Sequence, residues 1–275
     1  MARDLSAGVG LPRRRLLAWA GAPVLATWVV PGQAQVASLN DAINQAGRQR
    51  MLSQRMAKAW LAQGQQVEPR RAGKILAESV ALFDRQLQAL RDYAPTPAIG
   101  QSYGALALAW ADYRQALATL APSAANTPRL IALDSQVLAL AHQGTVALEA
   151  HAGKPVARLV NLAGRQRMLS QRMAKYYLVQ AWQAPVPDAG AQSALAQREF
   201  SAALNTLDSA PEATPAIRQD IELGRAQWVF FANALARVGD AQAPPRHAAE
   251  VFATSENILQ VMDRVTGLYA RLGTG

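Results

Sequence analysis

The chain has 275 residues, of which 51% are apolar, so it can bury a substantial core and is not intrinsically disordered. Alanine, leucine, glutamine and arginine outnumber β-branched and aromatic residues, which predicts an all-α protein. The formal net charge of +9 suits an anionic ligand or surface. The absence of cysteine excludes disulfides, thiolate zinc sites and thiol catalysis.

The first segment has the layout of a signal peptide. Arginines at 13–15 precede an apolar run over 16–30, which is short for a membrane span, and small residues then predict cleavage after Ala34. The adjacent arginines resemble a twin-arginine signal, with the general secretory route and an uncleaved N-terminal anchor as alternatives. We therefore expect a periplasmic product without residues 1–34, with a net charge of +6 and no nucleic-acid partner.

A thirteen-residue string, AGRQRMLSQRMAK, occurs twice, at Ala46–Lys58 and at Ala163–Lys175. The likeness continues along both halves at an offset of 117 residues, which lengthens slightly toward the ends. Other matching pairs are Asn44 and Asn161, Phe83 and Phe200, Trp110 and Trp228, and Thr145 and Thr266. This self-similarity predicts two tandem units, over residues 36–153 and 154–275.

Proline and glycine divide each unit at matching places, which predicts helices over about 36–66, 70–93, 97–120 and from 129 onward, and the same plan in the second unit. Helices of this length joined by short turns are typical of antiparallel four-helix bundles. We expect an all-α fold of two such bundles related by internal duplication. The join at 153–155 leaves two shapes open: a sharp break with the bundles side by side, or a kinked rod with them end to end.

On a helix, the repeated string places its arginines on different faces. Ile43, Arg50 and Ala57 are seven residues apart, so Arg50 lies within the apolar seam, and Arg167 has the same place in the second copy. The other arginines lie roughly 150° away. We expect solvation, or carboxylates of other helices, for Arg48, Arg55, Lys58, Arg165, Arg172 and Lys175.

An arginine in a helix seam is costly unless something negative meets it. Neither 44–61 nor 161–178 contains an acidic residue, so a partner must come from another helix, with Glu78, Asp84 and Asp112 as candidates in the first unit. The alternative is a small anion, because the planar guanidinium suits nitrate or carboxylate. Space for it would come from the small residues Ala46, Gly47, Ser53 and Ala57.

Residues Ile43-Asn44, Ala46-Gly47, Arg50-Met51, Ser53 and Arg55-Met56 resemble the characteristic segment of the NarX-like sensor domain family. Its members include the N-terminal domain of PilJ-type methyl-accepting chemotaxis transducers, and this spelling is closer to that branch. The resemblance implies a periplasmic helical bundle that binds nitrate or nitrite between two copies of the first helix. The implied ligand-binding residues are Arg50, Gly47, Arg167 and Gly164, with Asn44, Ser53, Asn161 and Ser170 as lesser candidates.

Two arrangements of that site remain open. In one, Arg50 and Arg167 face each other across an internal pseudo-two-fold axis and hold one anion. In the other, the units are stacked, and Arg50 meets Arg50 of a second chain in a homodimer.

The functional expectation follows from the same resemblance. Sensors of this family continue into kinase or methyl-accepting output modules, and the sequence ends at Gly275 without one. We expect a binding or sensing component that presents its anion to a membrane-bound sensor or transducer. The alternative is a helical interaction protein of a type IV pilus or chemotaxis system that binds no small ligand. We expect no enzyme, cofactor or metal site, since the three histidines are scattered without ligand spacing.

Overall fold

The computed structural model describes residues 36–238 and 245–272, so the predicted signal peptide lies outside the described residues. The described part is built of helices: α1 (Leu39–Gly64), α2 (Pro69–Tyr93), α3 (Pro97–Thr119), α4 (Thr127–Ala152), α5 (Pro155–Ala181), α6 (Ala189–Asp208), α7 (Pro215–Leu235) and α8 (Pro245–Arg271). The all-α prediction is confirmed, and the helices of the first unit begin and end within three residues of the predicted positions.

Local sequence explains where equivalent helices begin. The hydroxyl oxygens of Thr96 and Thr214 each accept a hydrogen bond, 3.3 Å long, from the backbone N–H of Ile99 and Ile217. A proline follows each threonine, at a position where a missing N–H costs nothing. Both units therefore start their third helix with the same cap.

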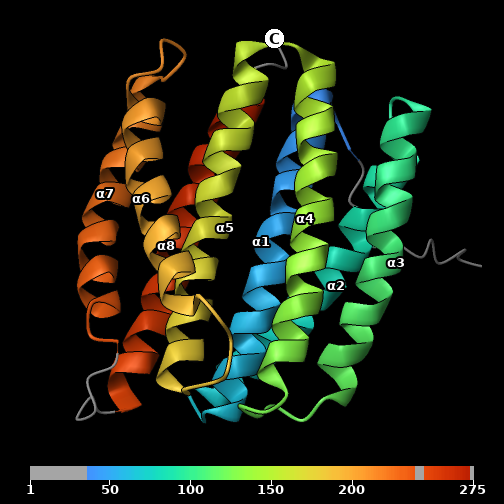
Figure 1. Cartoon of the computed structure of the whole chain (residues 1–275). Helices are drawn as coiled ribbons and strands as arrows, with labels where there is room; N and C mark the ends of the chain where they lie inside the picture. The colour runs from blue at the N-terminus through green and yellow to red at the C-terminus, as the bar shows by residue number, and fades with distance from the viewer. Residues whose placement is uncertain (1–35, 239–244, 273–275) are drawn as a thin grey trace, which may run out of the picture. The chain divides into compact units, whose positions relative to one another are not determined.

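Each unit is an antiparallel four-helix bundle, as predicted (Figure 1). In the first, α1 packs against α2 and α4, and α3 closes the bundle against the same two helices. In the second, α5 packs against α6 and α8, with α7 closing in the same way. The two bundles are thus copies of one plan.

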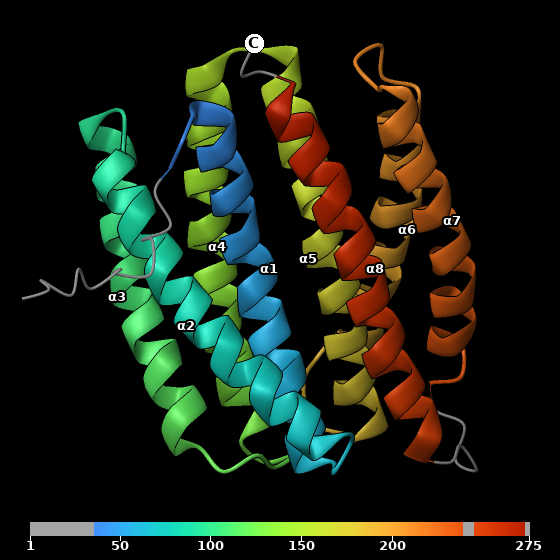
Figure 2. The same cartoon turned by 180° about the vertical axis from the view of Figure 1, so that it is seen from behind.

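The bundles lie side by side, which decides between the two shapes left open by the sequence (Figure 2). The most extensive helix contact of the described chain joins α1 and α5, which run in the same direction. Between α4 and α5 the chain reverses sharply, because Gly153 has a left-handed φ of 60° and Pro155 starts a new helix. Because Arg50 packs against α5, it is not available to meet Arg50 of a second chain.

The repeated string lies at the centre of the molecule. In α1, 20 of 26 residues are buried, against 7 of 25 in α2, because α1 is surrounded by α2, α4, α5 and α8. Farther out, matching aromatic pairs fill each bundle: Phe83 stacks on Trp110 at 4.1 Å between ring centroids, and Phe200 lies 5.0 Å from Trp228. Among the described helices, none combines the length and apolarity needed to span a membrane.

Candidate functional site

The seam arginines meet where α1 and α5 approach most closely. Arg50 and Arg167 are both buried, at 1% and 0% exposure. A methyl group placed on Gly47 would lie 3.8 Å from the Cα of Gly164, 3.2 Å from Nη2 of Arg50 and 3.4 Å from Nη2 of Arg167. The structure therefore brings together the two arginines and two glycines that the resemblance implied.

Each arginine reaches across to the other repeat. Arg50 Nη2 donates to the side-chain oxygen of Asn161 at 2.7 Å and to its backbone oxygen at 3.3 Å. Arg167 Nη2 donates to the backbone oxygen of Asn44 at 3.0 Å. Both arginines thus bind the asparagine of the other repeat, but only Asn161 also accepts through its side chain, since Asn44 Oδ1 has no hydrogen-bond partner among the described residues.

The two serines of the predicted site have a different role. Ser53 and Ser170 donate to the backbone oxygens of Arg50 and Arg167, three residues earlier on their own helices, at 2.9 and 2.8 Å. Their hydroxyl protons are therefore used within the helix and do not point toward a ligand.

The group that faces each arginine from the fourth helix also differs between the repeats. Arg167 Nη1 donates to Asp263 Oδ1 on α8 at 2.5 Å, and Arg48 Nη2 donates to the same oxygen at 2.8 Å. Arg50 Nη1 lies 3.3 Å from Nδ1 of His142 on α4. In the described part of the chain, no carboxylate forms an ion pair with Arg50. Arg167 thus has the carboxylate partner that the sequence left open, and in the described part of the chain Arg50 has none.

His142 and Asp263 occupy equivalent positions of the two repeats. The fourth helices match at an offset of 121 residues, which pairs Thr145 with Thr266; both hydroxyls donate to the backbone oxygen four residues earlier at 2.7 Å. The same offset pairs His142 with Asp263. Sequence reasoning missed both residues: the repeat alignment pairs them with each other, but only the packing of the fourth helices shows that they face the arginines.

Burial makes the positive charges of this cluster costly. Burial, together with the positive charges of Arg165 and Arg167, lowers the pKa of Arg50 from 12.5 to about 9. The negative charge of Glu149 opposes this shift; its carboxylate accepts a hydrogen bond from Asn161, which in turn binds Arg50. Burial lowers the pKa of Arg167 to about 10, opposed by Asp263. Within the described residues, the buried Nε atoms of both arginines have no hydrogen-bond partner.

The surroundings of His142 favour its neutral form. Burial lowers the pKa of His142 below its ordinary value of 6.5, and the positive charges of Arg50 and Arg165 lower it further. A neutral imidazole with its proton on Nε2 leaves Nδ1 as an acceptor for the Arg50 N–H. The imidazole therefore satisfies a donor of Arg50 without neutralising its charge.

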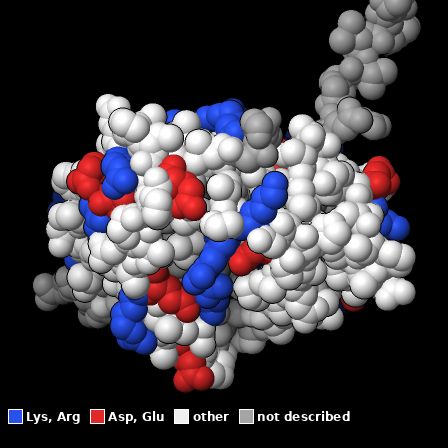
Figure 3. Space-filling model, turned by 90° about the horizontal axis from the view of Figure 1, so that it is seen from above, with Lys and Arg blue, Asp and Glu red and all other residues white. Residues whose placement is uncertain are grey.

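A cleft of about 360 Å³ opens beside Arg167, lined in part by Asn44, Arg48, Asp263 and Arg264. The side chain of Asp263 is 44% exposed, whereas that of Arg167 is fully buried, so Asp263 lies between Arg167 and solvent. From above, basic side chains cross the middle of this end of the molecule, with acidic ones beside them (Figure 3).

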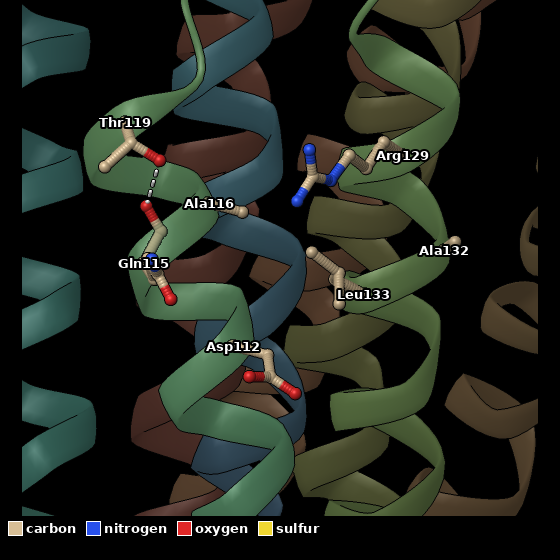
Figure 4. A pocket seen from close by; sticks show the side chains of 7 residues that line it. All are labelled: Asp112, Gln115, Ala116, Thr119, Arg129, Ala132 and Leu133. Carbon is tan, nitrogen blue, oxygen red and sulfur yellow. Dashed lines mark hydrogen bonds between the residues drawn. The ribbon is translucent and has the colours of Figure 1, made fainter.

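The acidic residues named as candidates from the sequence form no ion pair with Arg50. Asp84 accepts a hydrogen bond from Trp110 Nε1 at 2.7 Å, and Glu78 lies 3.8 Å from Lys74. Asp112 lines a separate hollow of about 400 Å³ between α3 and α4 (Figure 4). Those three predictions are wrong, because each residue lies on a helix face turned away from the α1–α5 contact.

The remaining basic residues of the string are bound by other helices. Arg55 and Arg165 pair with Glu256 and Glu199, while Arg172 binds the side chain of Gln192. Lys58 and Lys175 are fully buried and pair with acidic groups at 2.6 Å. Solvation was thus the wrong alternative for the two lysines, because the central helices are covered on nearly every face.

The described chain is a duplicated helical domain with a cationic cluster at the contact between its repeats. Its sequence matches the family described as type IV pili methyl-accepting chemotaxis transducer N-terminal domain, PilJ, twice, at residues 34–135 and 151–254. The chain therefore belongs to this family, whose domains are sensory parts of transducers and not enzymes. Comparison with curated proteins and with solved structures finds no match.

Proposed function

We propose that this chain is a periplasmic binding or sensing protein for a small oxyanion, nitrate or nitrite, which Arg50 and Arg167 hold between α1 and α5. One observation carries the proposal. Two buried guanidinium groups converge on a glycine pair, only that of Arg167 binds a carboxylate directly, and the Nε donors of both have no hydrogen-bond partner among the described residues. A buried cation in that state gains by binding an anion.

The chemistry of the site favours a small planar anion. Guanidinium groups form parallel N–H···O bonds with flat, multi-oxygen anions, and those bonds strengthen away from water. The glycines let the helix backbones and both Nη2 atoms come close together. The resemblance implies a site between two copies of the first helix, and in this chain α1 and α5 supply both copies.

The proposed partner is a membrane-bound sensor or transducer, because the family consists of transducer sensory domains. An anion held by both first helices would change the α1–α5 contact, on which the arrangement of the two bundles depends. The receiving protein would then read that arrangement.

Calorimetry of the chain without residues 1–34 tests the anion site. We expect nitrate or nitrite to bind once per chain and to raise the melting temperature with increasing concentration. The double variant Arg50→Gln, Arg167→Gln should lose at least 100-fold in affinity, and Arg129→Gln, in the hollow between α3 and α4, should keep wild-type binding. Equal affinities in the wild type and the double variant would refute the site.

A second candidate function, an interaction protein that binds no small ligand, is favoured by exposed apolar side chains on α7. Leu223, Val229 and Phe230 are 42%, 57% and 63% exposed. Large apolar side chains exposed on one helix can contribute to a protein contact. This function predicts self-association in sedimentation experiments that nitrate does not alter and that Phe230→Ser abolishes.

A further inference from the structure

The two seam arginines differ in the charge of the residue that faces each of them from a fourth helix. Nδ1 of histidine and Oδ1 of aspartate are each bonded to Cγ, so they lie at the same distance along the side chain. In this structure they face the same atom of their arginine: His142 Nδ1 lies 3.3 Å from Arg50 Nη1, and Asp263 Oδ1 lies 2.5 Å from Arg167 Nη1. The two repeats thus place acceptors of different charge at equivalent positions.

The charges around this position are unequal. On the second-repeat side, Asp263 bridges Arg167 and Arg48. On the first-repeat side, the groups facing His142 are Arg50 from α1, Arg165 from α5 and Glu149 from its own helix. Arg165 is already paired with Glu199 at 2.7 Å, and Glu149 accepts a hydrogen bond from Asn161. Arg50 is the guanidinium of the pair that lacks a directly bound carboxylate.

We propose that His142 and Asp263 determine the specificity of the site: Asp263 acts as an internal carboxylate ligand of Arg167, and His142 leaves Arg50 free to bind one singly charged oxyanion. This inference rests on the proposed function and deepens it. The site is then not the symmetric one that the repeated string suggests, since the anion binds principally to Arg50. A second negative charge on the anion would lie close to the Asp263 carboxylate and be repelled. Nitrate and nitrite therefore bind in preference to sulfate.

Two pairs of variants separate charge from shape. His142→Asp puts a carboxylate oxygen where Nδ1 now lies, and His142→Asn puts a neutral oxygen there. Asp263→Asn removes the charge from the equivalent position and keeps an acceptor. Arg50 and Arg167 stay unchanged in all of them, so any effect comes from the facing group.

The measurement is calorimetric titration of each variant with nitrate and with sulfate at pH 7. We expect His142→Asp to weaken nitrate binding at least tenfold and His142→Asn to stay within threefold of the wild type. Asp263→Asn should raise the affinity for sulfate relative to nitrate at least fivefold. As a readout without ligand, His142→Asp should raise the melting temperature in buffer free of these anions, because Arg50 gains a carboxylate partner.

The outcomes distinguish this inference from the function on which it rests. If the wild type binds nitrate and His142→Asp binds it equally well, the inference is overturned while the anion site stands. If Asp263→Asn leaves the ratio of sulfate to nitrate affinity unchanged, the role of Asp263 is overturned. A wild-type chain that binds neither anion overturns both proposals.

Discussion

At the scale of single residues, the unusual feature is a buried arginine without a carboxylate. A buried ion pair that loses one partner costs free energy, because the remaining charge is uncompensated. Arg167 belongs to such a pair with Asp263, whereas Arg50 has only neutral acceptors in direct contact, from His142 and Asn161. Two residues with the same sequence context therefore differ in how far their charge is compensated.

Replacing each arginine by methionine tests this difference in the absence of ligand. Arg167→Met should lower the free energy of unfolding by about 1–3 kcal/mol, since it breaks a pair whose carboxylate is partly exposed. Arg50→Met should be neutral or stabilising, because it removes a charge that burial disfavours. The measurement is urea unfolding followed by circular dichroism, in buffer without nitrate, nitrite or sulfate. Equal losses in the two variants would show that Arg50 is compensated in a way the contacts do not reveal.

At the scale of helices, glycine controls how closely α1 and α5 approach. Glycine in the middle of a helix is less favourable than alanine by about 1 kcal/mol, so its presence there requires a packing reason. Gly47 and Gly164 have one: a methyl group on either would lie 3.2 or 3.1 Å from the Nη2 of its own repeat's arginine. Gly104, inside α3, has no atom within 4 Å of the corresponding point.

Alanine substitutions should therefore have different effects at these positions. Gly104→Ala should raise the free energy of unfolding by up to about 1 kcal/mol, through helix propensity alone. Gly47→Ala should show no such gain and should weaken nitrate binding, because the methyl group would lie 3.2 Å from Arg50 Nη2, which must then shift by a few tenths of an ångström. Unfolding in urea and nitrate titration of both variants measure the two effects. A Gly47→Ala chain as stable as Gly104→Ala, with unchanged affinity, would contradict the close contact.

At the scale of the whole molecule, buried ion pairs connect the two repeats. Lys58 on α1 pairs with Glu256 on α8, and Lys175 on α5 pairs with Asp134 on α4, so each first helix is bound to the fourth helix of the other repeat. Arg55 adds a second contact to Glu256 at 2.5 Å. The bundles are therefore joined by charge pairs as well as by apolar packing, which favours one arrangement of the repeats over others.

The pH dependence of stability should reveal the Glu256 contact. Burial alone raises the pKa of Glu256, but Lys58 and Arg55 outweigh it and lower the pKa from 4.5 to about 2. A folded-state pKa below the unfolded value means that the stabilisation is present above about pH 4.5 and is lost as the pH falls toward 2. Glu256→Gln should lower the free energy of unfolding by about 3 kcal/mol at pH 7 and flatten its fall between pH 4.5 and 2.

The matched control for that prediction is Glu78→Gln. Glu78 lies 3.8 Å from Lys74, and both side chains are more than half exposed, so the change should stay within about 0.5 kcal/mol. Thermal or urea unfolding at several pH values measures both variants. If Glu256→Gln followed the same pH curve as the wild type, the carboxylate of Glu256 would not stabilise the fold.

The sequence alone determined much of this protein. Its internal repeat, the proline and glycine breaks and the heptad spacing of Arg50 and Arg167 predicted the duplicated bundles, the helix ends and the seam position of both arginines. These properties follow from interactions between residues a few positions apart, such as the caps of α3 and α7 and the periodicity of apolar side chains.

Only the tertiary structure decided how the bundles are placed and what faces each arginine. Packing of the first helix against the fourth within each bundle brought Arg50 within 3.3 Å of His142, 92 residues away, and Arg167 within 2.5 Å of Asp263, 96 residues away. Side-by-side packing of the two bundles buried Lys58 and Lys175 against helices of the opposite repeat. The physical reason is that charge compensation in a core depends on which helices meet within and between the bundles, and no local pattern along the chain encodes those contacts.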